Sequence, residues 1–318
     1  MSESRTLNAG TRLAGFAVVL TGALGAGALL GGAVGPVDVS EATGGMEGME
    51  GMEGMDGDAA TVSGLSAVDQ GYAFVPTATT LRPDQPFTFI IEGPDGDPVT
   101  DYEVELDKEL HLLVVSTDLV TYQHVHPERD EQGTWSVTLD DLDPGSYRAV
   151  ADVVPADGPA LALGVNLSAP GEFDPTPLPA PAAVDQVDGY EVRLEGDLRS
   201  GSSPVRLIVE RDGEAVDDLE PYLGASGHLV AFRADDLAYA HVHPEETTPE
   251  GAGEGAPASA RGPTVPFIAE LPSAGTYRLF FDFAHEGEVR TAAFTVEVVA
   301  DGDGADDQAD DTTTEEDH

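Results

Sequence analysis

The sequence predicts an all-β protein made of two tandem β-sandwich domains behind an N-terminal transmembrane or signal helix. From about Tyr72 onward, short runs of β-branched and aromatic residues alternate with Gly, Pro and Asp turns roughly every ten residues, the pattern of a sandwich. Much of this region occurs twice, which predicts two domains. An uncharged apolar segment near the N-terminus supplies the predicted helix.

The N-terminal part of the chain divides into three segments. Residues 1–12 are polar and carry Arg5 and Arg12, and we interpret them as a cytoplasmic N-terminus. Residues 13–35 contain no charge and are about as long as a span of ~30 Å of hydrocarbon requires, so we expect an anchor or a cleaved signal. The preceding arginines predict that the remainder lies outside the cell. Residues 36–66 form a Gly-rich acidic arm that we expect to be disordered.

Composition shifts set the remaining boundaries. We predict a first sandwich over residues 67–168, a Pro-rich linker over 169–183 and a second sandwich over 184–299. The acidic, polar residues 300–318 are expected to be an unfolded tail. The second sandwich contains 13 extra residues between its two halves, which fit within the segment EETTPEGAGEGAPASARGP and predict a loop insertion there.

The charge is extreme: 60 acidic against 14 basic residues give a formal net charge of −46, and Lys108 is the single lysine. Such a surface repels itself strongly unless molar salt shortens the Debye length to about 3 Å, so we interpret it as a halophile-type adaptation. Nucleic acid is excluded as a partner because phosphate contacts need basic patches. The absence of cysteine excludes disulfides, thiolate metal sites and a blue-copper centre.

The most informative motif is a histidine triplet that occurs twice. His111, His124 and His126 are followed by His228, His241 and His243, each 117 residues later, and the neighbouring text Tyr-x-His-Val-His-Pro-Glu repeats with them. Imidazole is the commonest protein ligand for borderline transition metals. Spacing preserved in two copies therefore predicts two metal sites, one in each sandwich. The alternative is that these are polar residues on a solvent-facing side of a sheet.

Strand geometry explains how each triplet converges. His124 and His126 are two residues apart, so on a strand they project from one face. The polar segment Ser116–Asp118 separates them from His111 and predicts a hairpin in which His111 lies opposite His124 or His126, with Cβ atoms about 5 Å apart. In the second copy the turn centre falls between Ala234 and Asp235.

Three imidazoles leave one coordination position open. Only the second sandwich offers a further histidine for it, His285, where the first has Pro155, so we predict two sites of unequal affinity. Asp152 and Asp282 occupy matching positions and are either partners for an imidazole N–H or ordinary strand-edge carboxylates. Tyr147 and Tyr277, in matching Gly-x-Tyr-Arg segments, are expected to be core aromatics at sandwich corners.

A methionine repeat lies in the predicted arm. Met46, Met49, Met52 and Met55 occur at a strict three-residue spacing in GMEGMEGMEGMDG, and apart from Met1 the chain has no other methionine. In a flexible segment these thioethers cannot fill a core, and soft thioether sulfur selects Cu(I) over hard cations. The repeat therefore favours copper; the alternative is a slipped codon repeat without function.

Two segments carry a resemblance to a known group. KELHLLVVSTDLVTYQHVHPE and GHLVAFRADDLAYAHVHPE, each followed by a Gly-x-Tyr-Arg strand, resemble secreted or membrane-anchored bacterial and archaeal copper-handling modules of immunoglobulin-like or cupredoxin-like type, such as the periplasmic copper-resistance and YtkA-like proteins. The resemblance covers about half the chain. It implies two tandem immunoglobulin-like β-sandwich domains that bind copper outside the cytoplasm through the six matching histidines.

The function predicted from the sequence is extracytoplasmic metal binding, for copper sequestration or delivery, with Cu(II) at the histidines and Cu(I) at the methionine arm; zinc or nickel are alternatives. The predicted partners are a membrane, reached through the N-terminal segment, and a copper transporter or another envelope copper protein. A metal-free structural or adhesion protein of the envelope is the main alternative. A metal-dependent oxidoreductase is less favoured, because the chain lacks the ligand sets of Cu/Zn superoxide dismutases and cupins.

Overall fold

A computed structural model describes residues 63–82, 85–140, 142–240, 242–244 and 263–301. Within this part of the chain every regular element is a β-strand, which confirms the all-β prediction. None of the described segments forms a helix with the length and apolarity that a membrane crossing requires. The predicted helix at 13–35, most of the arm at 36–66 and the tail after residue 301 lie outside the described residues.

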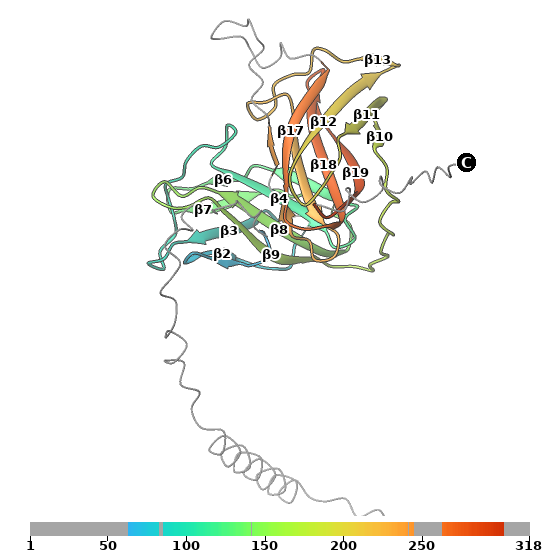
Figure 1. Ribbon diagram of the computed structural model, residues 1–318. Coiled ribbons are helices and arrows are strands. Elements are labelled where there is room, and N and C mark those ends of the chain that lie inside the picture. The colour runs from blue at the N-terminus through green and yellow to red at the C-terminus, as the bar shows by residue number, and fades with distance from the viewer. Residues whose placement is uncertain (1–62, 83–84, 141, 241, 245–262, 302–318) are drawn as a thin grey trace, which may run out of the picture. The chain divides into compact units, whose positions relative to one another are not determined.

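The first sandwich consists of two antiparallel sheets (Figure 1). One has the order β1-β2-β3-β7-β6 and the other the order β5-β4-β8-β9. The strands are β1 (Val68–Asp69), β2 (Tyr72–Pro76), β3 (Phe87–Glu92), β4 (Leu110–Ser116), β5 (Tyr122–Val125), β6 (Glu128–Arg129), β7 (Thr134–Val137), β8 (Gly145–Val153) and β9 (Leu161–Ala169). Alternate residues of β3 are buried, as expected for a strand with one face on a core. The core between the sheets includes Phe89, Trp135 and Leu163.

The second sandwich repeats this arrangement. Its sheets have the orders β10-β11-β12-β17-β16 and β15-β14-β18-β19, with β13 (Glu214–Ala215) paired to β12. The other strands are β10 (Val184–Val187), β11 (Tyr190–Glu195), β12 (Gly201–Arg211), β14 (His228–Arg233), β15 (Tyr239–Ala240), β16 (Val242–Pro244), β17 (Thr264–Leu271), β18 (Gly275–His285) and β19 (Glu288–Val298). Phe267, Phe281 and Phe283 lie in the core between its two sheets.

The connectivity is immunoglobulin-like. In immunoglobulin lettering, β2, β3, β7 and β6 of the first domain are strands A, B, E and D, and β5, β4, β8 and β9 are strands C′, C, F and G. In the second domain the same letters fall on β11, β12, β17 and β16 and on β15, β14, β18 and β19. β1 and β10 are additional strands at the edge next to strand A. Each domain also has a tyrosine corner at the start of strand F. Tyr147 donates to the backbone oxygen of Asp143 (2.7 Å), and Tyr277 donates to that of Ser273 (3.0 Å). The prediction that these tyrosines are core residues at sandwich corners is therefore confirmed.

The two domains pack through the outer faces of their C′-C-F-G sheets. A separate apolar cluster joins β4 and β8 of the first domain to β14 and β18 of the second, and includes Leu113, Val150, Val230, Phe232 and Phe280. Both faces of β4 are buried as a result, which explains why its sequence LHLLVVS is apolar without alternation. Tyr122 stacks on Phe280 across this boundary, with ring centroids 4.1 Å apart and planes 4° apart.

Matching residues of the two domains make reciprocal contacts across this boundary. The Tyr122 hydroxyl donates to Asp282 Oδ2 (3.4 Å), and the Tyr239 hydroxyl of the other domain donates to Asp152 Oδ2 (2.8 Å). A residue pair that exchanges roles in this way is the mark of an isologous interface, here formed by two repeats of one chain. Packing the two strand F faces together brings each aspartate next to the other domain.

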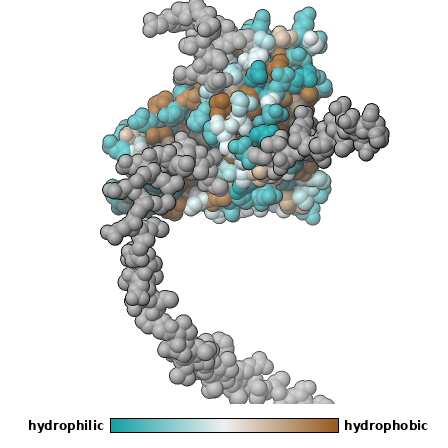
Figure 2. Space-filling model, in the orientation of Figure 1, coloured by the Kyte–Doolittle hydropathy of each residue, from teal (hydrophilic) through white to brown (hydrophobic). Residues whose placement is uncertain are grey.

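The N-terminal edge of the folded region differs from the prediction. Residues 63–66 fall in the arm predicted to be disordered, yet Ser63 forms a bridge with Tyr239 and Gly64 donates to the Ala162 oxygen (3.0 Å). A side chain at Gly164 would collide with the Gly64 carbonyl, so the close approach depends on glycine. Polar side chains cover much of the face shown in Figure 2, as the composition requires.

Candidate functional site

The first histidine triplet converges as predicted. β4 and β5 form the expected hairpin, with Leu113 opposite His124 and Leu112 opposite Val125, a register that continues toward His111 opposite His126. The ring centroids of His124 and His126 are 4.8 Å apart, and that of His111 lies 5.3 Å and 5.1 Å from them. The three residues present nitrogen atoms that all lie within 4.8 Å of one another, close enough to hold one metal ion.

The second domain contributes to the same cluster. His228 on β14 lies next to the triplet, its ring centroid 4.7 Å from His124 and 5.6 Å from His111. Asp282 on β18 is the cross-strand partner of His228, and its Oδ2 lies 3.0 Å from His124 Nδ1. His124, His228 and Asp282 form a second group whose ligand atoms lie within 4.8 Å of one another. The cluster thus belongs to both sandwiches.

The hydrogen bonds fix the tautomers of two histidines. His111 Nε2 lies 3.0 Å from the backbone oxygen of Glu105, which only accepts, so Nε2 carries the ring proton and Nδ1 presents a lone pair. His111 Nδ1 lies 3.1 Å from His124 Nε2, which therefore donates to it. Neutral His124 then presents a lone pair from Nδ1 to Asp282 Oδ2. Without a metal, that contact needs a proton on the carboxyl group.

Burial favours a proton on this carboxyl group below about pH 6. It raises the pKa of the Asp282 carboxyl to about 6, although a hydrogen bond from Thr291 (2.6 Å to Oδ1) acts in the opposite direction. Burial, together with the charge of His111, lowers the pKa of His124 to about 3. Burial also lowers the pKa of His126 to about 3, with the charges of His124 and His111 adding to the effect. Imidazoles held neutral in this way have lone pairs free for a metal ion.

One ligand atom has no hydrogen-bond partner in the described part of the chain. His126 Nε2 is buried and makes no hydrogen bond to the described residues. Leaving a buried polar atom unsatisfied costs about 1–3 kcal/mol, so such atoms are rare and often mark a binding site. Here the atom lies beside two further imidazoles that present lone pairs or exchangeable protons. The cluster therefore has the donor set and the unmet bonding capacity of a metal site.

The remaining predicted ligands fall into two sets. His241 and all four methionines of the repeat, Met46, Met49, Met52 and Met55, lie outside the described residues. His243 is exposed on β16, opposite Ile268 in the other sheet. His285 has both ring nitrogens in hydrogen bonds, with the Tyr190 hydroxyl (2.7 Å) and Asp218 (3.0 Å). The sequence predicted one site per sandwich. Among the described residues, the histidines that cluster are the first triplet and His228, because strand C of each domain packs against the other domain.

Asp282 is the principal residue of the cluster whose role the sequence leaves open. It matches Asp152 in the repeat, and the sequence allows either an imidazole partner or an ordinary strand-edge carboxylate. The side chain of Asp282 is only 3% exposed, and a carboxylate is almost never fully buried without a partner. The available signal was its place between Phe281 and Phe283 in the segment Leu279–Ala284 of β18, where apolar residues do not alternate with polar ones, a pattern that predicts burial on both faces.

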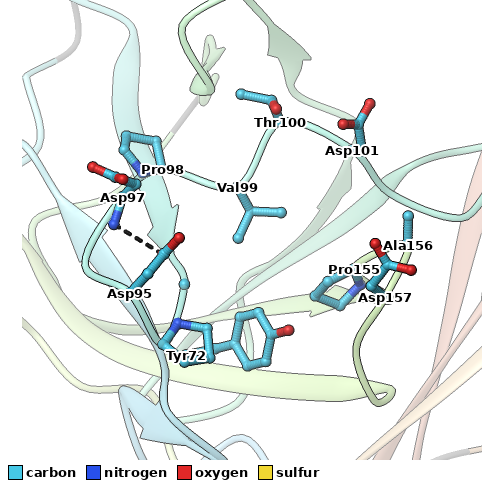
Figure 3. A pocket seen from close by; sticks show the side chains of 12 residues that line it. Tyr72, Asp95, Asp97, Pro98, Val99, Thr100, Asp101, Pro155, Ala156 and Asp157 are labelled. Atoms are coloured by element: carbon cyan, nitrogen blue, oxygen red, sulfur yellow. Dashed lines mark hydrogen bonds between the residues drawn. The ribbon is translucent and has the colours of Figure 1, made fainter.

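A concavity on the first domain lies outside this cluster. It has a volume of about 400 Å³ and is lined by Tyr72, Pro155 and four carboxylates, Asp95, Asp97, Asp101 and Asp157 (Figure 3). All four aspartates are exposed to solvent, and the Asp97 backbone amide already donates to Asp95 (3.2 Å). Exposed acidic groups in a chain of net charge −46 are expected without any ligand, so we assign no site here.

The fold and the cluster thus define a two-domain immunoglobulin-like protein with an inter-domain histidine site. A family model described as "Domain of unknown function (DUF8832)" matches residues 66–169 and again residues 185–300. These two matches cover well over half of the chain, which therefore belongs to this family. No curated protein matches the chain.

Solved structures with similar folds are distant. A DUF4426 family protein from Pseudomonas aeruginosa PAO1 is 10% identical and covers 36% of this chain and 96% of its own, with a TM-score of 0.26. The FN1–FN3 domains of chicken CNTN1 are 11% identical and cover 76% of this chain and 69% of their own, with a TM-score of 0.19. Domains 5–6 of the S-layer protein SbsC are 12% identical and cover 72% and 97%, with a TM-score of 0.22.

Proposed function

We propose that this protein binds a transition-metal ion at the boundary between its two sandwiches. The observation that carries the proposal is the convergence of His111, His124 and His126, with the buried Nε2 of His126 lacking any partner among the described residues. The hydrogen bond from His111 Nε2 to the Glu105 oxygen supports it, because metal-binding imidazoles commonly donate their second N–H to a carbonyl or carboxylate.

Copper is the metal we propose. A set of imidazoles and one carboxylate suits Cu(II), Zn(II) or Ni(II), and among divalent first-row ions Cu(II) binds such a set most tightly. The methionine repeat at residues 46–55 adds thioether ligands suited to Cu(I). The apolar segment at 13–35 and the arginines before it support an extracytoplasmic location, at a membrane or secreted from it. The role we propose is sequestration or delivery of copper to a transporter or another envelope protein.

The metal content of the full-length protein tests this proposal. Protein purified at high salt is loaded with Cu(II), desalted and analysed by elemental mass spectrometry, beside the variant His124→Gln. His124 belongs to both groups of ligand atoms, so we expect this variant to retain little copper. His285→Gln serves as a control and should retain copper like the parent, because both of its ring nitrogens already have partners.

The outcomes separate the candidate functions. Equal copper retention by the parent and His124→Gln would defeat the site assignment. A parent that retains no Cu(II), Zn(II) or Ni(II) would favour the metal-free envelope protein, in which the apolar inter-domain cluster has a structural role alone. Loss of copper in the His285→Gln variant would restore the ligand role expected from the sequence. Near-ultraviolet circular dichroism of each variant shows whether it is folded.

A further inference from the structure

The two nitrogens of His124 face two different groups of ligand atoms. Nε2 lies 3.1 Å from His111 Nδ1, on the side of the first triplet. Nδ1 lies 3.0 Å from Asp282 Oδ2, on the side of His228 and the second domain. Each group contains three ligand atoms within 4.8 Å of one another, and His124 is the one residue that both contain.

A single ion cannot use both sides of this ring. The lone pairs of an imidazole lie in the ring plane and diverge, and a metal ion sits about 2.0–2.1 Å from one nitrogen along that direction. An ion on His124 Nε2 leaves Nδ1 to donate its proton to Asp282 Oδ2, and leaves His228 outside the ligand set of that ion. An ion on Nδ1 leaves His126 Nε2, already without a partner among the described residues, unsatisfied. One ion therefore uses one of the two groups of ligand atoms and not the other.

We propose that the site holds two metal ions bridged by the imidazole of His124, an inference that rests on the proposed function. The first ion has His111, His124 Nε2 and His126 as ligands. The second has His124 Nδ1, His228 and Asp282, and so is held mainly by the second domain. Each ion keeps an open position for water or a further ligand, because three protein ligands do not complete a tetrahedral set.

Proton balance is consistent with the bridge. The neutral ring of His124 carries one proton, and its two nitrogens contact His111 Nδ1 and Asp282 Oδ2. Binding of an ion at each nitrogen displaces that proton to solvent and leaves an imidazolate and the Asp282 carboxylate as ligands. These two negative groups offset part of the charge of two divalent cations. The surrounding chain, with a formal charge of −46, lowers the electrostatic cost further.

Copper stoichiometry and electron paramagnetic resonance test the bridge in the full-length protein. We expect the parent to retain two Cu(II) per chain after desalting. Antiferromagnetic coupling through the imidazolate should reduce the integrated resonance intensity well below that of two isolated Cu(II) ions. His126→Gln should retain one ion at the second group and Asp282→Asn one ion at the first, each with the full intensity of one isolated Cu(II). Tyr122→Phe, which removes only a hydrogen bond to Asp282, should retain two coupled ions.

The result separates two proposals: that His124 bridges two ions, and that the cluster binds metal at all. A parent with one retained ion, or with two ions of full uncoupled intensity, would overturn the bridge while leaving the metal-binding function intact. A parent that retains no ion would overturn both. The resonance measurement on the parent needs no substitution, so it remains decisive if a variant does not fold. Loss of all copper in both His126→Gln and Asp282→Asn would indicate one ion that needs every ligand, and would also refute the bridge.

Discussion

The two copies of the histidine motif have almost the same sequence but different places in the fold. In the first copy β5 extends to Val125 and keeps His124 beside His111. In the second copy β15 ends at Ala240, and β16 begins at Val242 in the opposite sheet. His243 is therefore exposed, whereas its counterpart His126 lies within the cluster. Equal spacing in sequence therefore placed the last histidine of each copy in a different environment.

The strand that follows the motif pairs with the opposite sheet in both domains. In the first domain β6 begins at Glu128, two residues after His126, and a turn closed by Gly133 N donating to the Asp130 oxygen (3.1 Å) connects it to β7. In the second domain β16 already pairs with β17 from Val242, so His243 is part of the paired strand. The strand thus joins the other sheet sooner after the hairpin in the second copy.

The largest difference that we expect between the two domains is in how much the buried strand F face of each contributes to the free energy of unfolding. Phe280 and Val150 occupy matching positions in the strand F faces, and both are buried there. Phe280→Ala should lower the free energy of unfolding by about 3–5 kcal/mol, because it also removes the ring that stacks on Tyr122. Val150→Ala should cost about 1–2 kcal/mol. Chemical denaturation at fixed high salt measures both. Equal losses would show that the two faces contribute alike.

The matched pair His126→Gln and His243→Gln tests the comparison directly. The first substitution removes a buried ligand atom, so we expect the affinity of the first ion to fall by at least about 100-fold. The second changes an exposed residue in the other sheet and should leave the affinity within about two-fold of the parent. Isothermal titration with Cu(II) in a competing chelator provides the measurement. A comparable loss in His243→Gln would mean that the second triplet forms its own site.

The two reciprocal tyrosine–aspartate hydrogen bonds should differ less in their contributions to stability. Tyr239→Phe removes a 2.8 Å hydrogen bond to Asp152, and Tyr122→Phe removes a 3.4 Å bond to Asp282. A carboxylate acceptor makes the shorter bond worth about 1.5–3 kcal/mol, and the longer one should be worth less than about 1 kcal/mol. The midpoints of thermal unfolding of the two metal-free variants show which hydrogen bond contributes more to stability. The reverse order would indicate that the first domain, not the second, supplies the tighter contact.

The pH dependence of stability tests the protonation of Asp282. Its pKa rises from an unfolded value of 3.8 to about 6 on folding, so its contribution is fully present below pH 3.8 and is lost as the pH rises through 6. In metal-free protein, the stability of the parent relative to Asp282→Asn should therefore fall by up to about 1.4 kcal/mol per pH unit between these values. Denaturation at pH 4.5, 5.0 and 5.5 measures this slope. A slope of zero or of opposite sign would place the proton elsewhere.

Local chemistry explains how much the sequence predicted. The hairpin between β4 and β5 follows from strand periodicity and a polar turn, so the convergence of His111, His124 and His126 was predictable. The tyrosine corners at Tyr147 and Tyr277 were predictable from their Gly-x-Tyr-Arg segments for the same reason. These features depend on residues that are near in sequence or on adjacent strands.

The sequence by itself thus determined the all-β fold, the internal repeat, the first triplet and the chemistry of its ligands. Only the tertiary structure decided that His228 and Asp282 complete that cluster, because this depends on how one sheet packs against another rather than on any spacing along the chain. It also decided that His243 lies in a different sheet and that His285 bonds to Tyr190 and Asp218. Long-range packing of two apolar sheet faces brought His228 and Asp282 of the second domain next to the first triplet.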